Sequence, residues 1–182
     1  IGGQLNVSNS ALRLKNYGTF NVAKAINLEG KYTKEIFNYN YLNCNNSLNI
    51  TGNGQNTASV SINNYSIFNV TRHLNSSYNN GIVNIINDPS LGTSDLGLVP
   101  VFNVGLSMTI SKDNNSFSNL NNGIAYIGRD LNLERGTIIN NGTININRDF
   151  DIKQGEFTNN FSAYVTRDFI ISNASGITHN NG

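Results

Sequence analysis

Three arginine–aspartate pairs recur at one spacing near the end of the chain: Arg129-Asp130, Arg148-Asp149 and Arg167-Asp168 follow one another at 19-residue steps. Two further basic residues, Lys24 and Arg72, occupy the equivalent position in earlier and less regular repeats. If the repeats stack, these five basic side chains form a stripe. Guanidinium groups in such an array could bind a polyanion or a sugar through bidentate hydrogen bonds.

A second interpretation of these pairs is structural. Aspartate is a common turn residue because its side chain bonds nearby backbone N–H groups. The arginines would then neutralise a column of like charges. Turn chemistry favours this interpretation, so the five basic residues remain a candidate ligand stripe with a structural explanation beside it.

The remaining polar residues do not combine into a catalytic or metal site. His73 and His179 lie far apart in the chain, and neither has metal-ligand spacing to another histidine or cysteine. Asp88, Asp95 and Asp113 could approach one another, but no calcium-loop motif surrounds them. We therefore expect no enzymatic activity, no catalytic residue, no cofactor and no metal ion.

The single cysteine, Cys44, excludes an internal disulfide. No basic residue is close to it in sequence, so we expect an inert thiol in an irregular segment rather than a nucleophile.

The charge balance argues against two classes of partner. The chain has 12 Lys and Arg, 11 Asp and Glu, and a net charge of +1, and its basic residues are scattered singly. Binding to nucleic acid or to an anionic membrane needs clustered basic residues, so neither partner is expected. No apolar run has the length of a transmembrane helix, and we expect no direct insertion into a membrane.

The elements that carry these residues follow from an internal repeat. Asn-Asn-Gly at 121–123 recurs at 140–142 and 180–182, and 159–161 has phenylalanine in place of glycine. We number each repeat from the third residue of this triplet (Gly123, Gly142 or Phe161), which is position zero. Positions 2, 4, 8 and 10 are then apolar: Ala125, Ile127, Leu131, Leu133; Ile144, Ile146, Phe150, Ile152; Ala163, Val165, Phe169, Ile171. Alternation with a period of two indicates half-buried strands rather than helices.

Each repeat is too short to bury its own apolar face, and identical offsets let the face be buried by stacking one repeat on the next. The pattern predicts an all-β fold: a single-stranded parallel β-helix (a β-solenoid) with about 19–21 residues per coil.

Asparagine replaces the usual surface charges. Charged residues make up 13% of the chain, whereas it contains 37 asparagines. Stacked asparagines can hydrogen-bond along the axis of a solenoid, and we expect columns just before the repeat glycine and at position 3. The position-3 column is Asn21, Asn69, Asn84, Asn103 and Asn145. The recurring glycine suggests a bend with positive φ.

Two segments break the frame, at 31–47 and at 86–99, and we expect loops or hairpins that leave the coil there. Neither has the composition of a linker, so residues 1–182 are expected to form one β-helix segment. The sequence starts at Ile1 and ends within a repeat, which suggests a segment of a longer protein that stacks on further repeats of the same chain.

The string IGRDLNLERGTIINNGTININRDFDIKQGEFTNN resembles the haemagglutinin repeats of filamentous-haemagglutinin-like bacterial exoproteins, over 121–182 most clearly. The resemblance implies a right-handed parallel β-helix that is secreted to the bacterial cell surface, in an adhesin or a contact-dependent inhibition protein, with no catalytic residues. The asparagine content departs from that family and leaves open another secreted lineage, such as an autotransporter passenger or another giant adhesin.

These observations lead to an expected function with one alternative. The first is a structural stalk or adhesin segment of a large secreted surface protein, which contacts glycans or proteins of host cells, neighbouring cells or other surfaces. The alternative is a β-helical polysaccharide-binding or polysaccharide-degrading protein, which would need an irregular groove with clustered Asp, Lys or Arg.

Overall fold

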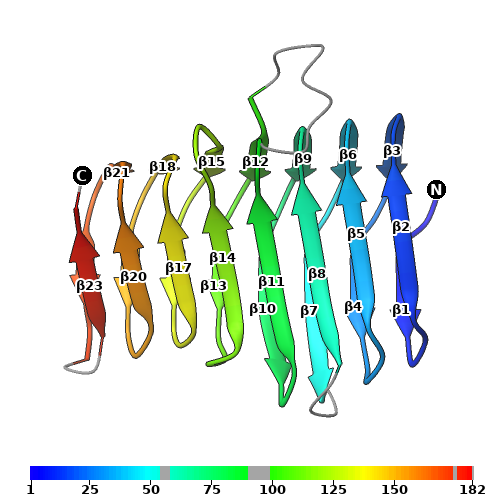
Figure 1. Ribbon diagram of the computed structural model, residues 1–182, viewed down its shortest axis with the longest axis horizontal. Helices are drawn as coiled ribbons and strands as arrows, with labels where there is room; N and C mark the ends of the chain where they lie inside the picture. Colours follow the sequence, from blue (N-terminus) through cyan, green and yellow to red (C-terminus); the bar gives the residue numbers. More distant parts are fainter. Residues whose placement is uncertain (54–57, 90–98, 174–175, 182) are drawn as a thin grey trace.

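The computed structural model describes residues 1–53, 58–89, 99–173 and 176–181, and these residues form strands and no helix (Figure 1). The strands belong to three parallel sheets.

The first sheet has 8 strands: β1 (Leu5–Ser8), β4 (Ile26–Glu29), β7 (Leu48–Asn53), β10 (Leu74–Asn79), β13 (Met108–Ile110), β16 (Leu131–Leu133), β19 (Phe150–Ile152) and β22 (Phe169–Ile171). The second also has 8: β2 (Leu12–Asn16), β5 (Lys34–Asn38), β8 (Ser59–Asn64), β11 (Ile82–Asn87), β14 (Asn115–Asn119), β17 (Thr137–Asn140), β20 (Glu156–Asn159) and β23 (Ile177–Asn180). The third has 7: β3 (Thr19–Val22), β6 (Tyr41–Cys44), β9 (Ile67–Val70), β12 (Val101–Val104), β15 (Ile124–Ile127), β18 (Thr143–Ile146) and β21 (Ser162–Val165).

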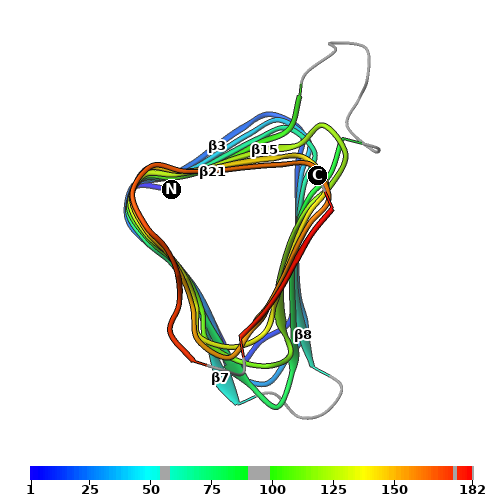
Figure 2. The same cartoon turned by 90° about the vertical axis from the view of Figure 1, so that its left-hand side faces the viewer.

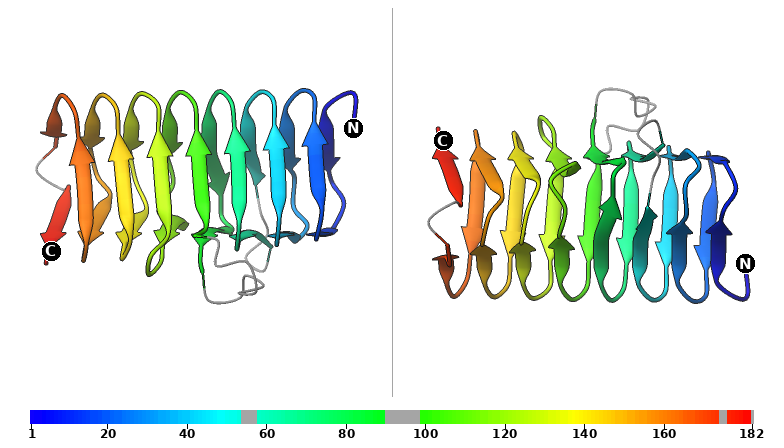
Figure 3. Two further views of the ribbon diagram at one scale, coloured as in Figure 1. Left: turned by 90° about the horizontal axis from the view of Figure 1, so that it is seen from above. Right: turned by 90° about the horizontal axis from the view of Figure 1, so that it is seen from below.

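The chain visits the three sheets in turn, so each strand pairs with the strand that comes three later in the sequence. Viewed along the rod, the sheets form the sides of a triangle (Figure 2). The N- and C-termini lie at opposite ends (Figure 3). This is the predicted parallel β-helix, with about 7 turns.

The coils are longer than predicted, at about 22 residues on average. Equivalent residues of neighbouring coils are 19 apart between Asn140 and Asn159, but 26 apart between Asn38 and Asn64 and 32 apart between Asn87 and Asn119. The strands on both sides of the longer stretches pair in register, so the differences in coil length do not disturb the pairing of the strands. The strict period therefore belongs only to the last coils.

The insertion predicted at 31–47 is wrong. Strands β5 and β6 occupy most of this segment and pair in register with the coils before and after them. Within the other predicted insertion, at 86–99, strand β11 continues to Asn87, and residues 90–98 lie outside the described residues.

Apolar side chains fill the triangle in columns, one from each coil. Phe68 and Phe102 are partners in one such column, with ring centroids 5.1 Å apart, and Phe102 also contacts Phe117 of the second sheet, at 5.6 Å. Cys44 belongs to such a column, between Val22 and Val70, and is completely buried. Burial raises the pKa of its thiol. The cysteine is thus a core residue, not part of an irregular segment.

One inward column is polar throughout. The last inward-facing residue of every strand in the second sheet is asparagine, and from β5 to β17 these asparagines are completely buried. The members of this inner ladder are Asn16, Asn38, Asn64, Asn87, Asn119, Asn140, Asn159 and Asn180. Each side-chain amide donates to the Oδ1 atom of the next member, at 2.7 to 2.9 Å.

Asparagine suits this position because its amide group has two N–H donors and a carbonyl acceptor. One donor continues the ladder, and the other reaches backbone carbonyls at the corner. Asn38, for example, donates to Asn40 O and to Ile67 O of the next coil, both at 2.8 Å. The inner ladder therefore satisfies corner carbonyls that would otherwise be buried without a partner.

The repeat glycine accommodates this ladder by its size. A Cβ atom on Gly142 would lie 2.2 Å from Gly123 O and 2.9 Å from Asn119 Nδ2. Neither Gly123 nor Gly142 has positive φ, so the expected role of the repeat glycine in a left-handed bend is wrong at these positions. Close approach of neighbouring coils requires glycine here.

Other asparagines form ladders on the outer surface. On the third sheet, Asn43, Asn69 and Asn103 each donate to the asparagine of the preceding coil at 2.7 Å, beginning with Asn21. This confirms most of the predicted position-3 column. Asn84 does not belong to it, because it lies on the second sheet beside Ser61 and Ser116.

Replacing one inner asparagine should be costly. We expect Asn119→Ala to lower the free energy of unfolding by about 2–4 kcal/mol, because the Asn87 amide and the Asn140 carbonyl lose their partners in a dry interior. Urea denaturation followed by circular dichroism measures this. The matched control is Asn69→Ala on the outer surface, where water replaces the lost bonds and the loss should stay below about 1 kcal/mol. Equal losses in the two variants would contradict a structural role specific to the inner ladder.

Candidate functional site

The corner between the third and the first sheet carries the predicted basic stripe. Backbone hydrogen bonds at 3.0 Å join Arg129 N to Leu106 O, Arg148 N to Arg129 O and Arg167 N to Arg148 O, so these residues stack in one column. Lys24 and Arg72 lie in the same column, but two coils without a basic residue interrupt it. Asn46 lies between Lys24 and Arg72, and Leu106 lies between Arg72 and Arg129. The stripe is continuous only over the last three coils.

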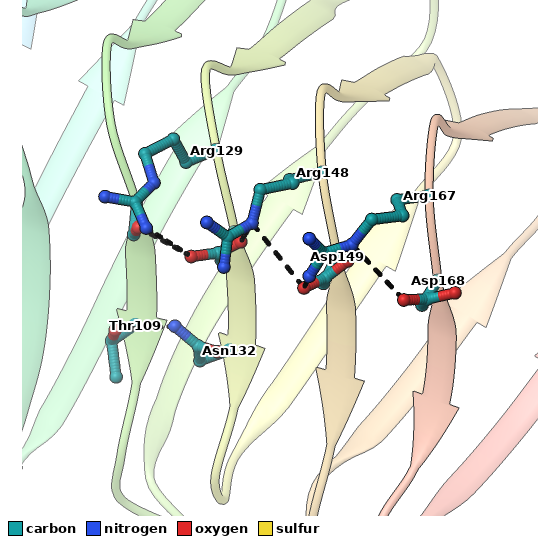
Figure 4. Close-up of polar contacts among 9 residues, drawn as sticks. Thr109, Arg129, Asn132, Arg148, Asp149, Arg167 and Asp168 are labelled. Atoms are coloured by element: carbon teal, nitrogen blue, oxygen red, sulfur yellow. Dashed lines mark hydrogen bonds and ion pairs between the residues drawn. The ribbon is translucent and has the colours of Figure 1, made fainter.

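Within those three coils the arginines and aspartates interlock (Figure 4). Arg148 Nε lies 2.9 Å from Asp130 Oδ1 in the preceding coil, and Arg167 Nε lies 2.6 Å from Asp149 Oδ1. Longer contacts join Arg148 to Asp149 of its own coil, at 3.6 Å, and Arg129 to Asp130, at 3.7 Å. The guanidinium groups of Arg148 and Arg167 therefore each link two coils along the axis of the rod, whereas Arg129 contacts only the aspartate of its own coil.

The electrostatics of the corner follow from this arrangement. The side chains of Asp130 and Asp149 are only 16% and 14% exposed, and each is covered by the arginine of the following coil. The hydrogen bond from Arg167 lowers the pKa of Asp149, and the same bond raises the pKa of Arg167. The geometry favours the structural interpretation of these pairs, because the carboxylates neutralise the basic charge that a polyanion would need.

The histidines do not meet. His179 lies on the outer face of β23 with Nε2 at 4.0 Å from a carboxylate oxygen of Glu156, whereas His73 lies at a corner before β10. The Asp113 carboxylate lies 3.6 Å from Arg135, and Asp95 lies outside the described residues. Over 1–53, 58–89, 99–173 and 176–181, no three His, Cys, Asp or Glu side chains are close enough together to hold a metal ion.

Lys34 is a buried charge that the sequence interpretation missed. It begins β5 and points inward between Leu12 and Val60, where it is completely buried. Its Nζ donates to Tyr32 O at 2.8 Å, and burial lowers the pKa of the ammonium. Lys34, Ile36 and Asn38 alternate along β5 and all point inward. This alternation indicates a buried lysine only once the segment is known to be a strand.

A second missed feature is a set of aromatic side chains at one corner and on the third sheet. Tyr17, Tyr39 and Tyr65 stack at the corner that follows the inner ladder, with ring centroids 4.7 and 5.0 Å apart. On the third sheet, Tyr126 and Tyr164 replace asparagine at position 3 of the repeat and are exposed. The repeat pattern could have revealed Tyr126 and Tyr164, since both occupy a position that carries asparagine in most other coils.

Comparisons with family models, curated proteins and solved structures find no match to this chain. The resemblance of 121–182 to haemagglutinin repeats therefore stays a prediction. In the part of the chain that the structure describes, no helix is long and apolar enough to cross a membrane.

The interlocked pairs predict a pH dependence. Since the bond from Arg167 lowers the folded-state pKa of Asp149, its stabilisation is fully present above the ordinary value of 3.8 and is lost as the pH falls through the lower folded-state value. We expect Asp149→Asn to be less stable than the natural sequence at neutral pH, with a difference that shrinks below about pH 4. Urea midpoints measured at several pH values test this.

Asp113→Asn is the control, because Asp113 is 75% exposed and makes one ion pair at 3.6 Å. Exposed pairs of this kind contribute little to stability, so its difference should be small at every pH. A difference for Asp149→Asn that stays constant down to about pH 2 would contradict the assigned role of Arg167.

Proposed function

We propose that this chain is a rigid stalk segment of a large secreted bacterial surface protein, which displays attachment surfaces away from the cell. The observation that carries the proposal is the inner ladder, which continues without a break from Asn16 in β2 to Asn180 in β23. A polar column of this kind, surrounded by apolar columns, holds successive coils in a fixed register. It supplies a scaffold rather than a reaction centre.

The outer surface fits display. Each coil presents side chains at the same three faces, and successive coils repeat them at intervals of about 4.8 Å. Such a surface offers many equivalent contacts in a line, and multiple weak contacts add up to strong attachment. The resemblance of 121–182 to haemagglutinin repeats supports the same role and a location at the bacterial cell surface.

A polysaccharide-degrading enzyme is the alternative function, and it has less support. Cleavage of a glycosidic bond by hydrolysis needs a pair of carboxyl groups that flank the bond, one of which is free to donate a proton. The best-placed carboxylates, Asp130 and Asp149, are both held by arginine and covered. The hydrogen bond from Arg167 lowers the pKa of Asp149, which favours the ionised form of this carboxylate and fits poorly with a general acid.

The test combines attachment and turnover. Bacteria that display the chain on a neutral outer-membrane anchor should adhere to cultured epithelial cells or to mucin-coated plates several times more than bacteria with the anchor alone. The purified chain should release no reducing sugar from neutral or acidic polysaccharides. The matched control displays Asn87→Leu with Asn119→Leu, which disrupts the inner ladder and should lose the adhesion.

Two outcomes would overturn the proposal. One is adhesion no greater than that of the anchor alone on both surfaces. The other is release of product that disappears in Asp130→Asn or Asp149→Asn, since that result would identify an enzyme.

A further inference from the structure

The outer face of the third sheet changes character in its last three strands. Tyr126 in β15, Asn145 in β18 and Tyr164 in β21 are direct partners in neighbouring strands, so their side chains stand in one row along the axis. The two tyrosines are 46% and 61% exposed. The row alternates an aromatic ring, an amide and an aromatic ring on a flat surface.

The amide at the centre of this row is available for a ligand. Earlier in the same column, Asn21, Asn43, Asn69 and Asn103 bond one another from coil to coil. Tyr126 ends that ladder, and within the described ranges the side chain of Asn145 makes no hydrogen bond. Because tyrosines stand on both sides of Asn145 in place of asparagine, the two N–H donors and the carbonyl acceptor of its side chain are unused.

The spacing of the row matches an extended oligosaccharide. Two coil-to-coil steps lead from Tyr126 to Tyr164, which places their backbones about 10 Å apart, a length comparable to two linked sugar rings. Aromatic faces bind the apolar C–H faces of pyranose rings, while an amide between them can donate to and accept from hydroxyl groups. The row thus offers two apolar ring faces with a hydrogen-bonding amide between them. A glycan chain offers the matching groups, which are the apolar faces of its sugar rings and the hydroxyl groups between them.

The charge near the row favours a neutral ligand. At the adjacent corner Arg148 and Arg167 are paired with Asp130 and Asp149, and Arg129 lies 3.7 Å from Asp130, so this part of the surface carries little net charge. Asn147 and Thr166, which lie two residues after Asn145 and Tyr164 in the sequence, are exposed and uncharged. An anionic chain would have to compete with Asp130 and Asp149 for the guanidinium groups of this corner.

We propose that Tyr126, Asn145 and Tyr164 form a binding site for an extended, neutral, β-linked glycan chain that lies along the axis of the rod. The site gives the attachment role proposed above a ligand class, and it rests on that role for its biological meaning. It is distinct from the arginine–aspartate corner, where the aspartates neutralise the charge of the arginines.

Isothermal titration calorimetry with cellohexaose tests the site. The natural sequence should bind, and Tyr126→Ala and Tyr164→Ala should each weaken binding about tenfold, the loss expected for one aromatic contact. Asn145→Ala should also weaken binding measurably. Tyr32→Ala is the matched control, since Tyr32 is 45% exposed and lies between β4 and β5, away from the row. The affinity of this variant for cellohexaose should equal that of the natural sequence.

Two further ligands define the specificity. Maltohexaose, which is neutral but curved, and an oligogalacturonate hexamer, which is extended but acidic, should both bind less well than cellohexaose. Unchanged thermal unfolding in each variant shows that the fold is retained.

The proposed site would be overturned by the absence of cellohexaose binding, by affinity unaffected in both Tyr126→Ala and Tyr164→Ala, or by preferential binding of oligogalacturonate that Arg148→Ala abolishes. These failures are separable from failure of the proposed function. Displayed cells can adhere through other residues while cellohexaose is not bound, and cellohexaose can bind while displayed cells fail to adhere.

Discussion

The inner ladder of asparagines is the interaction on which the rest of this structure depends. In the interior of the rod, each amide bonds the next amide along the axis and also the backbone carbonyls of the corner. Hydrogen bonds of this kind are strong in a dry interior, and an unpaired amide there is expensive. A shift of one coil by a single residue would turn its asparagine outward and expose its apolar column, so the ladder specifies register as well as stability.

This constraint explains how the coils can differ in length. The ladder and the apolar columns fix the strands, whereas the corners are free to contain additional residues. Neighbouring ladder members are therefore 19 residues apart in one place and 32 in another without loss of the bond between them. A scaffold that tolerates variation at its corners and on its outward positions can carry binding residues without disturbing its core, as at Tyr126 and Tyr164.

The sequence allowed the fold to be predicted because alternation and a regular repeat are visible in the last coils. The prediction failed at 31–47, where the coils are 22 and 26 residues long and Asn40 stands in place of the repeat glycine. Lys34 and Cys44 were assigned to an irregular segment for this reason. The five basic residues lie in one column, but the interruptions at Asn46 and Leu106 and the contacts with Asp130 depend on which coil neighbours which. Pairing between coils is tertiary information, and a single repeat does not contain it.

Hydrogen exchange of the asparagine side-chain amides, followed by nuclear magnetic resonance, measures the inner ladder directly. The amide protons of Asn38, Asn64 and Asn119 should exchange at least about a hundredfold more slowly than those of Asn43 and Asn69 on the outer surface, because they open only when coils separate. Inner and outer amides that exchange at the same rate would show that the ladder does not hold the coils together, and would contradict this account.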